Sequence, residues 1–161
     1  MNLLAASTLL ALMASPVLAC NEALFARLDA PPGTDPGLSI DVTEIGSTEG
    51  GEWQIWPDEA GTVEMVRVDY GEMGRSASRL VVVAPDAYAI TTTEFSYSAP
   101  IYVSGSSTIR QETDIFVFCE GRLHLPGEGF GVSESYAAKA REALAVFDAA
   151  EIAEHLPEMM R

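Results

Sequence analysis

The stretch that decides the fold is QETDIFVFCEGRLHLP, residues 111–126. An apolar run ends at Cys119, the pair Glu120-Gly121 follows as a two-residue turn, and a short second run ends at Pro126. Two β-rich runs separated by two such residues predict an antiparallel hairpin, although Glu-Gly is a weaker turn signal than Asn-Gly. The chain is therefore expected to be built on a sheet.

A two-residue turn determines which residues of the hairpin face each other. Cys119 is expected opposite Arg122, and Val117 opposite His124. Because side chains alternate along a strand, the two faces collect different residues. One face takes Phe116, Phe118, Leu123 and Leu125, with Phe116 opposite Leu125, and the other takes Ile115, Val117 and Cys119. Since both faces are apolar, the pattern predicts a central strand covered on both sides rather than an edge strand.

The sequence before the hairpin alternates short β-rich runs with turn residues. A connection rich in Pro, Gly and acidic residues occupies residues 30–51 and has room for a short strand at 38–42. Further strands are expected at residues 52–56, 62–70, 78–84 and 87–97, with turns at 57–61, 71–76 and 85–86 and a loop at 99–107 in which 101–103 can be extended. The brief turns predict an antiparallel β-meander of about five or six strands.

Two helices are expected to pack on this sheet. A short amphipathic helix follows Asn21 and directs Leu24, Phe25 and Leu28 inward. A longer helix is expected after an N-cap at Ser133 or Ser135 and runs to about residue 155. Its apolar stripe consists of Tyr136, Ala140, Leu144, Phe147 and Ile152. The predicted fold class is α+β, with the longer helix on the Phe116 face and the N-terminal helix on the Cys119 face.

The first segment predicts export from the cytoplasm. Residues 1–19 contain no charged side chain, an apolar core at 3–12, and small residues before Cys20, which is the pattern of a signal peptide. The apolar span is short and broken by Pro16, so no membrane span is expected in the mature form. The length of the remaining chain fits one exported domain, residues 20–161, in a secreted or periplasmic location.

Cys20 and Cys119 are the only cysteines, and Cys20 can be used in two ways. In an oxidising compartment the two are expected to form a disulfide, which we favour. Val-Leu-Ala-Cys also resembles a bacterial lipoprotein box, in which the cysteine is acylated. Leu18 stands where that box more often has a small residue, and the helical pattern begins directly after Asn21 instead of a polar tether.

Charge and composition narrow the range of partners. The 24 acidic and 9 basic residues give a formal net charge of −15, whereas nucleic acids and anionic membranes are bound mainly through Lys and Arg. Neither is expected as a partner. A cationic partner is permitted, although solubility alone explains a strongly acidic surface.

The polar residues form no recognised catalytic or metal-binding motif. His124 and His155 are far apart in sequence, and His124 is expected to be a half-buried structural residue. The acidic connection lacks the spacing of a calcium loop; its acids are Asp35, Asp41, Glu44, Glu49 and Glu52. The glycine-rich residues 127–131 lack a basic residue for an anion site. No catalytic, metal-binding or cofactor-binding residue is assigned.

The sequence favours an exported, non-enzymatic accessory or binding domain for an unknown protein or small molecule. One alternative is a hydrolase that uses acidic residues with His124, and another is a lipid-anchored envelope protein acylated at Cys20. Trp53 and Trp56 lie on opposite faces of one strand, so one of them is free to bind a ligand if it is exposed. Core packing for both is the simpler interpretation.

Overall fold

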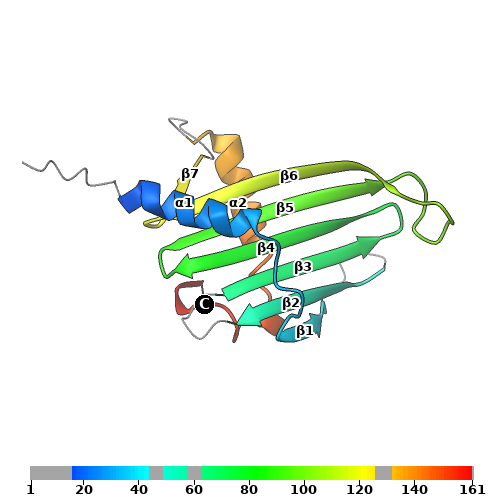
Figure 1. Cartoon of the computed structure of the whole chain (residues 1–161), viewed down its shortest axis with the longest axis horizontal. Helices are drawn as coiled ribbons and strands as arrows, with labels where there is room; N and C mark the ends of the chain where they lie inside the picture. The colour runs from blue at the N-terminus through cyan, green and yellow to red at the C-terminus, as the bar shows by residue number, and fades with distance from the viewer. Residues whose placement is uncertain (1–15, 44–48, 58–62, 126–131, 161) are drawn as a thin grey trace, which may run out of the picture.

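A computed structural model describes residues 16–43, 49–57, 63–125 and 132–160, and it contains one seven-stranded antiparallel sheet (Figure 1). The strands are β1 Leu38–Asp41, β2 Gly51–Pro57, β3 Val63–Gly71, β4 Gly74–Ala84, β5 Ala87–Tyr97, β6 Thr108–Cys119 and β7 Arg122–His124. They lie in the sheet in chain order, which confirms the predicted meander with more strands than expected. The predicted turn at 57–61, Glu44, Pro126 and most of the predicted signal peptide fall at least partly outside the described residues.

The hairpin of β6 and β7 has the predicted turn and register. Glu120 and Gly121 have φ angles of 53° and 70°, as a two-residue turn of the primed type requires. Cys119 pairs with Arg122 and Val117 with His124, but the predicted pairing of Phe116 with Leu125 is absent. The next hydrogen-bonded pair of the ladder would join residue 115 to residue 126, which is a proline and has no N–H to donate. The pairing of the two strands therefore ends at His124.

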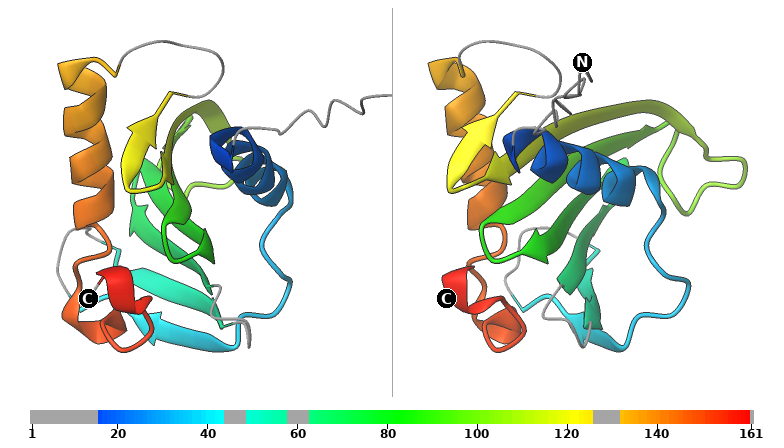
Figure 2. Two further views of the ribbon diagram at one scale, coloured as in Figure 1. Left: turned by 90° about the vertical axis from the view of Figure 1, so that its left-hand side faces the viewer. Right: turned by 60° about the vertical axis from the view of Figure 1, so that its left-hand side comes forward.

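Two helices lie on opposite faces of the sheet (Figure 2). On one face, helix α2 (Glu134–Ala145) packs over the larger core, which includes Phe116. On the other face, helix α1 (Pro16–Asp29) buries Leu24 against Val117 and Cys119. This arrangement confirms the α+β prediction and the assignment of each helix to its face. Helix α1 starts four residues before Cys20, earlier than expected.

The C-terminal helix is shorter than predicted. Ser133 caps it, with its Oγ accepting from the N–H of Tyr136 at 3.2 Å, but α2 ends at Ala145 and not near residue 155. Ile152 is eight positions after Leu144, so a continuous helix would turn it about 80° away from the stripe. The chain instead breaks and forms the 3₁₀ turns η1 (Ala150–Ile152) and η2 (Glu158–Met160), and Ile152 is fully buried in the core.

Glu151 attaches η1 to the sheet edge. Its Oε1 accepts hydrogen bonds from Trp53 Nε1 and from the N–H of Thr43, both at 3.3 Å. Burial opposes ionisation of this carboxyl, but the hydrogen bonds from its own backbone, Thr43 and Trp53 outweigh burial and lower its pKa. The side chain of Trp53 beneath it is fully buried and lies 5.6 Å from the ring of Phe147.

Strand β4 begins earlier than the sequence indicates. It starts at Gly74 rather than at residue 78, so the turn after β3 contains only Glu72 and Met73. Gly74 lies so close to β5 that a Cβ there would collide with the carbonyl oxygen of Phe95. The loop after β5 contains turns and no strand at residues 101–103. The early start of β4 adds Ser76 to the sheet, on the same face as Ser78.

The prediction that β6 is central holds only for its second half. Residues 115–119 are covered by both helices, but residues 108–114 are exposed. Strand β7 pairs only with residues 117–119, so the first half of β6 is an edge strand of the described sheet. Its polar residues, from Arg110 to Asp114, are consistent with that exposure.

Replacing Tyr136 with phenylalanine should test the attachment of α2 to β6. The hydroxyl donates to the carbonyl of Ile115 at 2.6 Å, and burial followed by the charge of Asp114 raises its pKa, which keeps the donor protonated. Loss of this bond should lower the free energy of unfolding by about 1 kcal/mol in urea titrations. The control Tyr97→Phe should change it by less, and equal effects in both variants would contradict the attachment.

Candidate ligand-binding cleft

Two rows of polar side chains cross the sheet on the face that α2 partly covers. Register pairs join each member to its neighbour on the next strand. The first row is Arg67, Ser78, Thr92 and Asp114, and the second is Asp69, Ser76, Glu94 and Glu112. The rows continue the face that holds Met65, Leu80, Ile90 and Phe116, because side chains two apart on a strand point the same way. The buried core therefore passes directly into a polar surface.

This polar surface and α2 enclose a cleft of about 1040 Å³. Both rows line it, and α2 contributes Lys139, Glu142 and Ala143. Lys139 Nζ lies 2.8 Å from Asp114 Oδ2, which joins the helix to the sheet at one wall. That hydrogen bond is the main cause of a raised Lys139 pKa, so the side chain stays cationic. The volume is at the upper end of the range for small-molecule sites.

Arg67 is held rigidly at the base of the cleft. Its Nε and Nη2 donate to the two oxygens of Asp69 at 2.8 and 3.0 Å, and its guanidinium lies 5.5 Å from the centre of the Trp53 ring. Only 9% of Arg67 is exposed. A bidentate pair of this kind fixes both side chains in one orientation, so the floor is already organised before any ligand arrives.

Negative charge exceeds positive charge in the lining. Five carboxylates face two cations, and Arg67 and Lys139 each neutralise one acid. Glu112 also pairs with Arg110 outside the cleft. Glu94 lies between these pairs, and its pKa is raised by burial and then by the charge of Asp69. A cationic group next to Glu94 would relieve this repulsion, so the cleft is chemically suited to a positively charged ligand with hydrogen-bonding groups.

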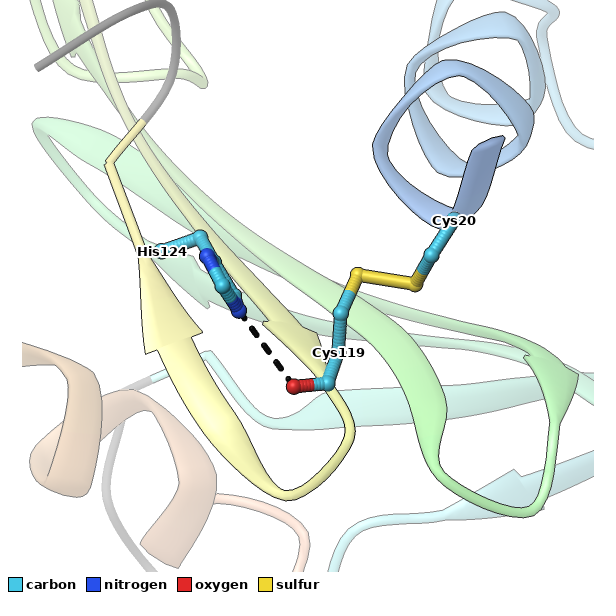
Figure 3. Close-up of a disulfide and its surroundings, with 3 residues drawn as sticks. All are labelled: Cys20, Cys119 and His124. Carbon is cyan, nitrogen blue, oxygen red and sulfur yellow. Dashed lines mark hydrogen bonds between the residues drawn. A yellow bond between two sulfur atoms is a disulfide. The ribbon is translucent and has the colours of Figure 1, made fainter. Parts of the chain in front are cut away.

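The predicted disulfide is present between Cys20 and Cys119, whose Cα atoms are 6.2 Å apart (Figure 3). It joins the N-terminal part of α1 to the end of β6 on the face opposite the cleft. His124 is partly buried beside it, as predicted, with Nε2 3.3 Å from the carbonyl oxygen of Cys119. The structure therefore brings these three residues together but places none of them in the cleft.

The remaining candidate residues lie elsewhere. His155 is 3.4 Å from Glu154 beyond the end of η1, and not at the end of a long helix. Trp56 is partly buried, and a Cβ on Gly33 would lie 3.1 Å from its indole, so the connection before β1 covers this ring. Within the described ranges, no group of three or more His, Cys, Asp or Glu side chains is placed to hold a metal ion. The glycine-rich residues 127–131 lie outside those ranges.

The cleft residues were not singled out in the sequence, although a signal for them exists. In β4, Ser76 and Ser78 have the same parity as the buried Leu80 and Val82. The same step from apolar to polar occurs at matching depth in β3, β5 and β6. These polar residues become neighbours only through the register of the four strands, and the sequence does not supply that register.

The comparisons with known proteins give no family assignment: no family model, no curated protein and no solved structure matches this chain. Among the helices of the described residues, none is both long and apolar enough to cross a membrane.

Proposed function

We propose that the protein is an exported, non-enzymatic binding domain and that the cleft beneath α2 is its ligand site. The observation that carries this proposal is the preorganised polar floor, in which the Arg67–Asp69 pair and the strand hydroxyls surround Glu94. The ligand is a small molecule or a peptide side chain that carries an amine, with hydroxyl or amide groups that can bond to the serine and threonine side chains.

Export is supported by two independent features. Residues 1–19 have the composition of a signal peptide. The Cys20–Cys119 disulfide is compatible with a secreted or periplasmic protein, because such bonds persist in oxidising compartments and are rare in the cytosol. The bond also occupies the Cys20 sulfur that acylation would require, so it favours the soluble form over the lipid-anchored alternative.

The hydrolase alternative has weaker support from the geometry. His124 lies beside the disulfide and is bonded to a backbone carbonyl, on the sheet face opposite Glu94 and Asp114. A general base needs to reach the proton that it removes, and the acids of the cleft are not within reach of this ring. A hydrolytic activity that is abolished in His124→Ala but retained in Glu94→Gln would establish this alternative instead.

Amine binding in the cleft can be tested with 1,4-diaminobutane and its neutral analogue 1,4-butanediol. The diamine should shift the backbone amide resonances of Ser76 and Thr92, and the diol should shift them less, because only the amine compensates Glu94. In Glu94→Gln the diamine affinity should fall by up to about fivefold, as expected for loss of one ion pair at an exposed carboxylate. Glu120→Gln, in the exposed turn after β6, serves as the matched control and should leave binding unchanged.

The same binding should weaken as the pH falls. Because its pKa is raised, Glu94 takes up a proton at a pH above the ordinary glutamate value, and the neutral acid no longer attracts the amine. Titrations from pH 7 downward should show this loss for the unmodified protein but not for Glu94→Gln. Diamine binding that is equal in both proteins, or independent of pH, would contradict the assignment of the cleft.

A further inference from the structure

The outer edge of β6 offers a backbone surface for another strand. Residues 108–116 of this strand have no partner on that side among the described strands, since β7 reaches only residues 117–119 (Figure 1). Residues 108–114 are exposed, and Ile109 among them has 67% of its surface exposed. An exposed edge of this length is a template for strand pairing.

The direction of the backbone groups along this edge follows from the neighbouring pairs. Cys119 and Val117 face β7, so every second residue before them also directs its N–H and C=O outward. Ile115 follows this alternation, because its carbonyl oxygen points away from β5 and accepts a hydrogen bond from the Tyr136 hydroxyl. Thr113 follows the alternation too. Its hydroxyl lies 3.0 Å from that of Thr93 on β5, and such a close approach is typical of facing residues that share no backbone hydrogen bond, so the backbone groups of Thr113 point away from β5. Gln111 and Thr113 therefore present their backbone groups to solvent.

We propose that this edge pairs with the same edge of a second copy, antiparallel, around a twofold axis at Gln111. The two Gln111 residues then face each other and exchange both backbone hydrogen bonds. Arg110 of each copy faces Glu112 of the other, which gives two opposite-charge pairs by symmetry. An axis at Thr113 would instead set Glu112 against Asp114, two like charges. The order Arg-Gln-Glu thus selects one register.

The paired side chains are free to make these contacts. Arg110 and Glu112 are 66% and 61% exposed, and at present they pair with each other along one strand. In the dimer, Arg110 and Glu112 would each pair with the opposite charge on the other copy instead. The two facing residues would share no backbone hydrogen bond, and side chains lie closest at pairs of this kind. Glu112 also lines the cleft, so the two clefts would lie on the same face of one extended sheet. This inference does not depend on the ligand proposed above.

Sedimentation equilibrium of the purified, disulfide-bonded protein tests the charge pairing. The unmodified protein should dimerise reversibly, and Arg110→Glu and Glu112→Arg should each raise the dimer Kd about tenfold or more, since both symmetric pairs become repulsive. The double variant with both changes should return close to the original Kd. If the unmodified protein remains monomeric up to its solubility limit, the charges only protect the edge and the proposal is wrong. It is equally wrong if the double variant does not recover.

Cross-linking tests the register itself. Cysteines at position 111 would have Cα atoms about 5.5 Å apart across the axis, within reach of a disulfide. Gln111→Cys should therefore give a covalent dimer on oxidation, while the control Met73→Cys, 52% exposed in the turn after β3, should not. A covalent dimer from both variants, or from neither, would overturn the register.

Discussion

Replacing both Cys20 and Cys119 with alanine should lower the free energy of unfolding more than the other substitutions proposed for this protein. The bond closes a loop of 99 positions, and in the chain-entropy model a loop of this length contributes up to about 4.7 kcal/mol. The loss should appear as a lower midpoint in guanidinium unfolding, with α1 separating from the sheet first. Leu24, Val117 and Cys119 form the small core that would be exposed.

Reduction of the unmodified protein provides the matched control. Treatment with dithiothreitol breaks the same bond without removing side-chain volume from the core, so it should give nearly the same loss as the double alanine variant. A much larger loss in the variant would mean that packing of Cys119, which is fully buried, matters more than loop closure. A loss below about 1 kcal/mol in both would show that α1 stays bound without its covalent link.

Replacing Arg79 with methionine should have the second-largest effect. The Arg79 Nε donates to Glu64 Oε1 at 2.7 Å. Its two other nitrogens donate to three carbonyl oxygens at and just after the end of α1, those of Arg27, Leu28 and Ala30. Glu64 is only 2% exposed, and its other oxygen has an ion pair with Arg27 at 2.8 Å without a well-aligned hydrogen bond. Removing one partner of a buried ion pair costs about 3–5 kcal/mol, and the buried Glu64 charge would then keep only Arg27, whose side chain is half exposed, as its ion-pair partner.

Three companion variants separate charge from packing at this site. Arg79→Lys should recover only part of the stability, since one ammonium cannot reproduce the planar set of donors. Adding Glu64→Leu to Arg79→Met should restore stability, because no buried charge then remains. The stability of all these variants is measured by urea titration, in which the control Arg122→Met, at an exposed position on β7, should change the free energy of unfolding little. If the double variant is no more stable than Arg79→Met, the buried carboxylate is not the source of the loss.

The sequence predicted the parts of this structure that depend on local alternation. Parity along residues 115–119 was enough to separate the faces of Phe116 and Cys119. The pairing of Cys119 with Cys20, which the structure contains, was predicted from the presence of only two cysteines in an exported chain. The predicted end of the C-terminal helix, near residue 155, was wrong because apolar residues continue past Ala145 at a spacing close to that of a helix. Their burial comes from a break in the helix, which depends on tertiary packing over β2 rather than on propensity.

The candidate site depends on information that no single strand contains. Arg67 and Asp69 resemble ordinary surface charges until the register places them next to Ser78 and Ser76. Glu64 and Arg79 resemble the same kind of residue, yet Glu64 is buried and Arg79 is partly buried beside it, beneath the end of α1. Polar residues on strands become a cleft or a buried pair only through their neighbours in the sheet, so both were missed for the same physical reason.

The bond between Cys20 and Cys119 also has a consequence for the order of events during synthesis. Cys20 is made first, and its partner follows only after five of the seven strands and nearly all of β6. The hairpins of the meander join near neighbours and can form while the chain emerges, because local contacts form fastest. Helix α1 is therefore fixed late, on a sheet that is nearly complete, and until then Cys20 stays exposed to other oxidised thiols.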